Sequence, residues 1–274
     1  MDGSLRGTHE RVAADQHESG TDIMSGESKD KIVTAAFLVI GDEILSGRTK
    51  DKNIGYLADF LTALGIDLSE VRIVPDEEDR IVEAVNALRA RYTYVFTSGG
   101  IGPTHDDITA DSIAAAFGVP IDHDPRAVKI LTDFYPQGQV TEARLRMARI
   151  PQGADLIENA VSRAPGFRIG NVHVMAGVPS VMQSMLDAIG PTLETGTRIL
   201  SRAIDADLPE SRIAGPLREI QEAYPGTMIG SYPRSIDGRF STQIVVRSRD
   251  EDLLDTAAEA VSAAVAAAVA ARSA

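Results

Sequence analysis

The sequence contains no cysteine and no tryptophan, and aromatic residues make up only 5% of it. Without a thiol the chain can form no disulfide framework, no thiolate metal site and no cysteine nucleophile. No apolar run approaches the roughly 20 residues that a membrane-spanning helix needs. The first 20 residues also lack the apolar core of a secretory signal. We therefore expect a cytoplasmic protein with no membrane partner.

Positive charge is also scarce, because 27 lysines and arginines face 40 aspartates and glutamates, for a formal net charge of −13. An acidic surface repels polyanions, so neither nucleic acid nor an anionic membrane is an expected partner. A small phosphate-containing molecule is compatible with this charge where backbone N–H groups or a metal ion hold it.

The composition divides the 274 residues into three parts. Residues 1–31 are polar and aperiodic, which predicts a disordered leader. Met24 offers a second start, so residues 1–23 are either native or an added leader, and the sequence leaves this open. Residues 32–199 form the predicted main domain. Residues 200–274 form a predicted small α+β domain that ends in an alanine-rich helix covering its sheet.

Strands alternate with helices at the start of the main domain. Strands are predicted at Ala35–Ile40, around Val71 and Ile73, and at Tyr92–Thr97, and helices from near Ile54, Ile81 and Thr109. Gly65 and Gly118 are expected to end two of the helices, and Thr109 is expected to cap the third. This alternation predicts an α/β fold with a mainly parallel sheet, whose ligands bind at the carboxyl ends of the strands.

The segment 97–109, TSGGIGPTHDDIT, follows the third predicted strand. Gly99, Gly100 and Gly102 permit positive φ angles and close backbone approach, and Pro103 stiffens the turn. Several N–H groups can then converge on an anion near the next helix. Acids beside an anion are unfavourable unless they bind a metal, carry protons or cap the helix. Mg²⁺ suits such a place, since it prefers one or two carboxylates together with phosphate oxygens.

Structural roles remain open for the same residues. Asp51 and Asn53 suit either ligand contact or capping of the helix that follows them. Asp106 and Asp107 suit either metal binding or a favourable interaction with the helix dipole. His105 suits either phosphate contact and proton relay or an exposed turn.

Several segments along the chain together resemble a known family. The segments GDEILSGRTKDKN, VPDEED, SGGIGPTHDDIT, ARIPQGADLIENAVSRAPGF and GVPSVM occur in the order found in the competence/damage-inducible protein A (CinA) family. The resemblance covers about residues 33–250, and the first part is also similar to the MoaB/Mog-like molybdopterin-binding domain. It implies a three-layer αβα domain followed by a small α+β domain, which agrees with the pattern of strands and helices.

The positions of the loops and the resemblance together predict a set of site residues. Catalytic roles are predicted for Asp51 and Asp107, which match family positions, and for His105, because it lies in the glycine loop. Ligand and phosphate contacts are predicted for Gly41, Asp42, Glu43, Asn53, Ser98, Gly99, Gly100, Gly102, Pro103, Thr104, Pro165, Gly166 and Phe167. Metal ligands are implied at Asp76, Asp106 and Asp107, for Mg²⁺, Mn²⁺ or Co²⁺. The runs ENAVSRAPGF and MAGVPSVM depart from the family pattern, so the resemblance is weaker for the second half of the site.

The activity implied by the resemblance is metal-dependent hydrolysis of a pyrophosphate bond, in a metabolite such as ADP-ribose or FAD, with water as nucleophile. The alternative is a module that binds molybdopterin or a nucleotide without reaction, which the altered second-half runs favour. The amidohydrolase domain of longer family members does not fit in the remaining residues, so nicotinamide-nucleotide deamidation is not expected. Related proteins imply a homo-oligomer, either a dimer or a trimer.

Overall fold

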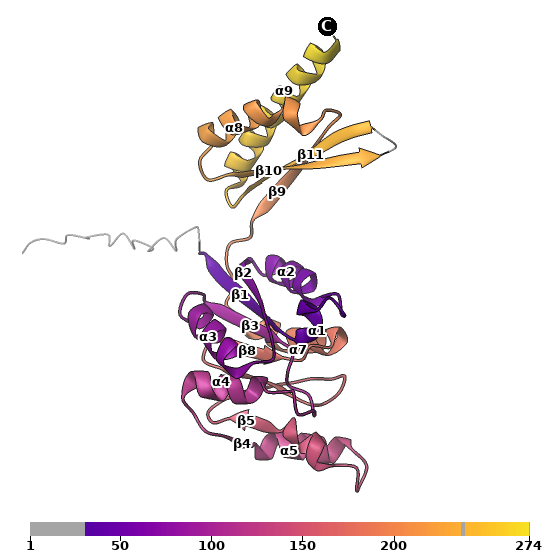
Figure 1. Cartoon of the computed structure of the whole chain (residues 1–274). Helices are drawn as coiled ribbons and strands as arrows, with labels where there is room; N and C mark the ends of the chain where they lie inside the picture. The colour runs from indigo at the N-terminus through magenta and orange to yellow at the C-terminus, as the bar shows by residue number, and fades with distance from the viewer. Residues whose placement is uncertain (1–30, 237–238, 274) are drawn as a thin grey trace, which may run out of the picture.

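The computed structural model describes residues 31–236 and 239–273, which form two units joined by a connection near residue 197 (Figure 1). The predicted disordered leader therefore lies, except for Lys31, outside the described residues. The first strand of the smaller unit begins at Leu200.

The larger unit is built on a six-stranded sheet with the order β2-β1-β3-β8-β7-β6. Its strands are β1 (Val33–Ile40), β2 (Ile66–Val74), β3 (Tyr94–Ser98), β6 (Asp155–Ile157), β7 (Gly166–Ile169) and β8 (Val172–Met175). Strands β2, β1, β3 and β8 are parallel, whereas β7 and β6 run antiparallel to their neighbours. A separate antiparallel pair joins β4 (Ile121–His123) to β5 (Arg149–Pro151).

Helices cover both faces of this sheet. The helices of the larger unit are α1 (Asp42–Leu45), α2 (Asn53–Ala63), α3 (Glu78–Arg89), α4 (Thr109–Phe117), α5 (Pro125–Phe134), α6 (Glu142–Arg146) and α7 (Pro179–Ile189). On one face Leu38 of β1 packs in a core with residues of α3 and α4, and on the other Phe37 packs with residues of α2 and α7. Strand β1 is buried on both faces, as its unbroken apolar run predicts. The predicted three-layer αβα domain with a mainly parallel sheet is confirmed.

The glycines expected to end helices do so, whereas the capping role expected of Thr109 was wrong. Gly118 is left-handed at the end of α4, and Gly65, with φ 71°, follows α2. Ile108 occupies the N-cap position of α4. Thr109 is the first helical residue, and its hydroxyl donates a hydrogen bond to the carbonyl of Gly99 at 2.9 Å. Its side chain therefore supports the glycine loop instead of the helix end.

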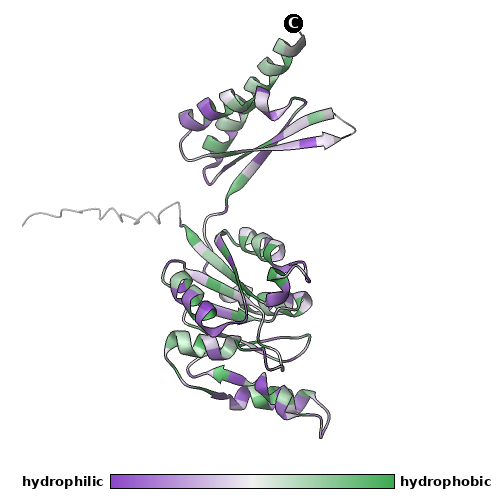
Figure 2. Cartoon of the chain, in the orientation of Figure 1, coloured by the Kyte–Doolittle hydropathy of each residue, from purple (hydrophilic) through white to green (hydrophobic). Residues whose placement is uncertain are grey.

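The smaller unit has an antiparallel sheet with the order β10-β11-β9. Its elements are β9 (Leu200–Ala206), α8 (Ala214–Ala223), β10 (Met228–Ile236), β11 (Arg239–Ser248) and α9 (Glu251–Ser273). Leu254, Val261 and Val265 of α9 are buried in one core with Ile244 and Val246 of β11. Figure 2 shows hydrophobic residues along much of α9. The alanine-rich tail thus forms the covering helix that the sequence predicts.

Helix α9 also tests the expectation that no segment is long and apolar enough to span a membrane. Within the described ranges it is the one helix whose length and apolar composition, over Glu251–Ala271 with a mean hydropathy of 1.6, would allow a membrane crossing. The expectation that no apolar run approaches this length was therefore wrong for α9. A core helix meets the same criterion, and here a stripe of α9 packs on the small sheet.

The connection between the units is anchored to the large sheet. Arg249, just after β11, donates to the carboxylate of Asp67 in β2 at 2.5 Å and to the carbonyl of Thr197 at 3.0 Å. A Cβ built on Gly65 would lie 2.2 Å from the carbonyl oxygen of Gly196. Gly65 therefore serves two purposes, since it ends α2 and lets the connection pass close to it.

His173 of β8 is the most buried histidine of the described chain, with 1% of its surface exposed. Its ring stacks on Phe96 at 5.2 Å between centroids, and its Nδ1 is buried without a hydrogen-bond partner in the described part of the chain. Burial, with a smaller contribution from the charge of Arg168, lowers the pKa of His173 to about 4. The folded state thus holds this imidazole neutral.

We expect this histidine to make the protein less stable in mild acid. Between pH 6.5 and about 4 the unfolded state binds a proton that the folded state does not, so stability is lost as the pH falls. In chemical denaturation at several pH values, wild type should lose up to about 1.4 kcal/mol per pH unit relative to His173→Leu across that window. Parallel pH profiles for the two proteins would contradict this assignment.

Candidate functional site

Three loops meet at the carboxyl ends of β1, β3 and β8, and Asn53 connects them. Its side-chain amide donates to the hydroxyl of Ser98 and to the carbonyl of Gly177, both at 2.9 Å. Asn53 is 5% exposed, and its Oδ1 is buried without a partner in the described residues. In this structure Asn53 and Ser98, both expected as ligand contacts, form a structural cross-link behind the loops.

The glycine loop takes a shape that side chains would prevent. Gly99 and Gly100 have φ angles of 110° and 66°. A Cβ on Gly99 would lie 2.1 Å from the carbonyl oxygen of Ile40, and one on Gly100 would lie 2.2 Å from the hydroxyl of Thr109. Because both positions need positive φ and close contact, only glycine fits them without distortion.

Asp107 closes the same loop from its other end. Its Oδ2 accepts hydrogen bonds from the backbone N–H of Thr104 at 2.8 Å and from the Thr104 hydroxyl at 2.5 Å. A Cβ on Gly102 would lie 2.6 Å from that oxygen. The third glycine therefore lets the carboxylate sit against the backbone, and Thr104 holds its orientation.

A second group of acids lies at the carboxyl ends of β1 and β2. Asp76 accepts a hydrogen bond from the backbone N–H of Asp42 at 3.0 Å. Burial raises the pKa of Asp76, and the negative charges of Asp42, Glu43 and Asp106 raise it further, although the Asp42 hydrogen bond opposes this. Mutual repulsion of this kind favours a bound cation.

A cavity of about 520 Å³ opens between the loops. Of the expected site residues, those that line it are Glu43, Gly99, Gly100, Gly102 and Asp107. The residues after β8 complete its wall, including Gly177 and Pro179. This is the edge of the sheet at which parallel α/β folds bind ligands.

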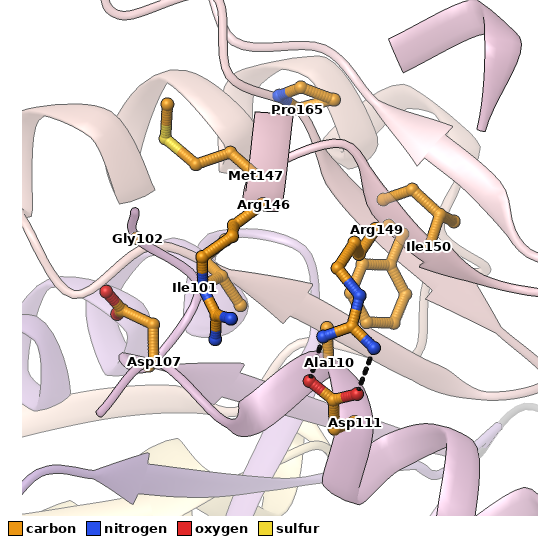
Figure 3. Close-up of a pocket in the computed structure, with 12 residues that line it drawn as sticks. Ile101, Gly102, Asp107, Ala110, Asp111, Arg146, Met147, Arg149, Ile150 and Pro165 are labelled. Atoms are coloured by element: carbon orange, nitrogen blue, oxygen red, sulfur yellow. Dashed lines mark hydrogen bonds and ion pairs between the residues drawn. The ribbon is translucent and has the colours of Figure 1, made fainter. Parts of the chain in front are cut away.

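A second, narrower cavity of about 20 Å³ is lined by the same glycine loop (Figure 3). Gly100, Gly102 and Asp107 line both spaces. Pro165 and Phe167 of the APGF segment line the narrower one. The APGF segment thus lies across this cavity from the glycine loop, as the resemblance implies.

Several expected residues do not line either cavity. Asp51 uses its Oδ1 to accept the backbone N–H groups of Asn53 at 3.1 Å and Ile54 at 2.8 Å, which is the capping alternative. His105 lies on the exposed part of the loop. Gly166 lies in β7, where a Cβ would be 2.4 Å from the carbonyl oxygen of Val174, so its absent side chain allows two strands to pack.

The expected metal ligands are not gathered into one cluster. Among residues 31–236 and 239–273, no three histidine, aspartate or glutamate side chains converge on a common point. The structure does not gather Asp76, Asp106 and Asp107 at one point: Asp107 hydrogen-bonds Thr104 and lines the cavity, whereas Asp76 accepts the backbone N–H of Asp42. The two carboxylates that share the larger cavity are Glu43 and Asp107.

Sequence reasoning missed the basic side chains of the narrower cavity. Arg149 forms two hydrogen bonds with Asp111 of α4, at 2.6 and 2.7 Å, and Arg146 lies beside it. The segment 144–149, RLRMAR, contributes three arginines to an acidic chain, and this local excess of positive charge was the available signal.

Residues 36–195 match the family described as the probable molybdopterin binding domain. The chain belongs to this family. Residues 198–273 match a second family, described as the middle domain of FAD synthase. The glycine loop and both cavities lie within the molybdopterin-binding domain, and the small sheet with α9 lies within the second match.

Individual relatives support the assignment. A protein from Aeropyrum pernix is 34% identical over 241 residues, which cover 84% of this chain and 90% of that protein. A probable FAD synthase from Caenorhabditis elegans is 29% identical over 248 residues, and the match covers 81% of this chain but only 48% of that protein.

A solved structure confirms the resemblance to the CinA family. The crystal structure of the protein CinA from Thermoplasma acidophilum, titled as a protein of unknown function, aligns with a TM-score of 0.56 at 34% identity. The alignment covers 60% of this chain and 99% of that one. This CinA-family protein thus carries the MoaB/Mog-like fold that the motifs predict.

Proposed function

We propose that this CinA-family protein binds an ADP-containing metabolite in the larger cavity and hydrolyses its pyrophosphate bond with the help of a divalent metal. The two matched families, a molybdopterin-binding domain and the middle domain of FAD synthase, point to a nucleotide-related function. The observation that carries the proposal is that the glycine loop and two carboxylates line one cavity.

The glycine loop supplies anion donors. Within the described residues, the backbone N–H groups of Gly100, Ile101 and Gly102 donate to no protein acceptor. All three residues line both cavities. Consecutive unpaired N–H groups with left-handed glycine geometry form a concave anion site. A phosphate placed there would accept these bonds, and they would also stabilise the charge that develops during cleavage.

The carboxylates suit a divalent cation. Mg²⁺ takes one or two protein carboxylates and completes its shell with water and substrate phosphate, so Glu43 and Asp107 are a sufficient donor set. A bound cation would neutralise phosphate charge and make bound water more acidic. In the reaction, a water oxygen forms a bond to one phosphorus while the bridging phosphorus–oxygen bond breaks. The products are two phosphate monoesters, one of them AMP.

The proposal is tested with the purified full chain and three substrates, ADP-ribose, FAD and NADH. Each is incubated with Mg²⁺, Mn²⁺ or Co²⁺, and AMP is quantified by chromatography. We expect AMP release that requires metal and stops when EDTA is added. A folded protein that releases no AMP from any of the nine combinations would reject the hydrolytic function.

A second function, binding of molybdopterin or a nucleotide without reaction, is favoured by one observation. In the part of the chain that the structure describes, no three-carboxylate metal cluster forms. Tight binding of the nucleotide without AMP release would support this module.

We further propose a cytoplasmic homo-oligomer, which light scattering would identify as dimer or trimer.

A further inference from the structure

We infer that Arg146 is the side-chain cation that binds the pyrophosphate of the ligand, opposite the carboxylates of the cavity. This inference rests on the proposed function in one respect, namely that the ligand carries phosphate. It does not require that the ligand be cleaved.

Arg146 reaches the glycine loop from a distant part of the sequence. It is the last residue of α6, and it lines the narrower cavity together with Gly100, Gly102 and Asp107. Figure 3 shows its guanidinium, in that view, between the carboxylate of Asp107 and the Asp111–Arg149 pair. Arg146 therefore lines the same narrower cavity as Gly100 and Gly102, the glycines whose backbone N–H groups are unpaired.

The Arg146 side chain lacks a partner. Its Nε is buried and has no hydrogen bond, and no ion pair joins it to any residue of the described chain. A buried donor without an acceptor costs stability, more so when the group is charged. Such a group is expected where a ligand supplies the missing acceptor. The neighbouring Arg149 is satisfied by Asp111 at 2.6 and 2.7 Å.

The carboxylates around the two cavities explain why a phosphate ligand would need the positive charge of Arg146. Glu43 and Asp107 line the larger cavity, and they would repel a pyrophosphate that met no positive charge. Among the residues that line the two cavities, the cations are Arg146 and Arg149. Arg149 is already paired, so Arg146 is the cation left to bind an anion. A guanidinium binds two phosphate oxygens at once through its planar fork.

The test measures binding by calorimetry, with and without Mg²⁺, for wild type, Arg146→Gln and Arg146→Lys. The probes are ADP-ribose and adenosine, which lacks phosphate. We expect Arg146→Gln to weaken ADP-ribose binding about 10- to 100-fold and to leave adenosine binding unchanged. Arg146→Lys should recover part of the loss, because it restores the charge without the fork.

Arg91→Gln is the charge-matched control. Arg91 precedes β3, at the end of that strand opposite the glycine loop, and its side chain is 72% exposed. Arg91→Gln removes the same charge as Arg146→Gln. Its affinity for ADP-ribose should stay within about twofold of that of wild type, as expected when an exposed ion pair is lost. Circular dichroism checks that each variant is folded.

AMP release measured in parallel separates the two proposals. Unchanged ADP-ribose binding by a folded Arg146→Gln would overturn the role of Arg146, even if wild type is an active hydrolase. Binding by wild type that Arg146→Gln loses, with no AMP release from either, would uphold Arg146 and reject hydrolysis. A wild type that binds no ADP-ribose under either condition would overturn both.

Discussion

Asp107→Asn is expected to lower AMP release at least about a hundredfold while the protein stays folded. Asp107 is the acid of the glycine loop that lines both cavities. Asparagine keeps an oxygen that accepts the Thr104 N–H, which Asp107 binds at 2.8 Å, so the loop shape should persist. The charge that would help to hold a metal beside the phosphate is lost.

The measurement is kcat and KM for AMP release, with the melting temperature recorded for each variant. Asp106→Asn is the matched control, because it removes the same charge at the neighbouring position. The side chain of Asp106 is exposed and lines neither cavity. We expect it to change kcat by less than about threefold. The assignment is wrong if Asp107→Asn keeps its activity, or if the two variants lose activity equally.

Gly99→Ala is expected to destabilise the protein by more than about 3 kcal/mol and to abolish ligand binding. The added Cβ would lie 2.1 Å from the carbonyl oxygen of Ile40, and the φ of 110° is itself unfavourable for alanine. The backbone of β1 must move to make room, and with it the loop that carries Glu43. Urea denaturation gives the change in the free energy of unfolding, and calorimetry with ADP-ribose gives the loss of binding.

Gly153→Ala separates the two causes. Gly153 also has a positive φ, 85°, but a Cβ there would meet nothing within 4 Å. We expect it to cost only about 1 kcal/mol, which is the conformational term alone. If Gly99→Ala cost no more than this control, the close packing of β3 against β1 would not be what requires glycine at this position.

Local pattern predicted much of the larger unit. The apolar run in β1 marked a strand buried on both faces, and Gly118 marked the end of α4. The glycine loop could be placed at the end of β3 because three glycines in four residues serve few other purposes. These predictions were sound because each depends on neighbours in sequence, through periodicity or an allowed φ angle.

The sequence did not decide whether an aspartate before a helix caps that helix or contacts a ligand. Asp51 and Asp107 each precede a helix and carry the same carboxylate. The structure turns Asp51 onto the N–H groups of Asn53 and Ile54, whereas Asp107 lines the cavity. Both arrangements satisfy the local hydrogen-bonding rules equally well, so only the position of the surrounding loops distinguishes them.

The αβα order, the glycine loop and the acidic segment beside it could be predicted because they follow from patterns within a few residues. Which side chains share the cavity could not be predicted in this way, because it depends on the folded chain. Arg146 meets Gly102 across more than 40 positions of sequence, and Asn53 meets Gly177 across 124. Such meetings depend on how strands and helices pack, which no local periodicity encodes. The unpaired guanidinium of Arg146 therefore became visible only once the chain was folded.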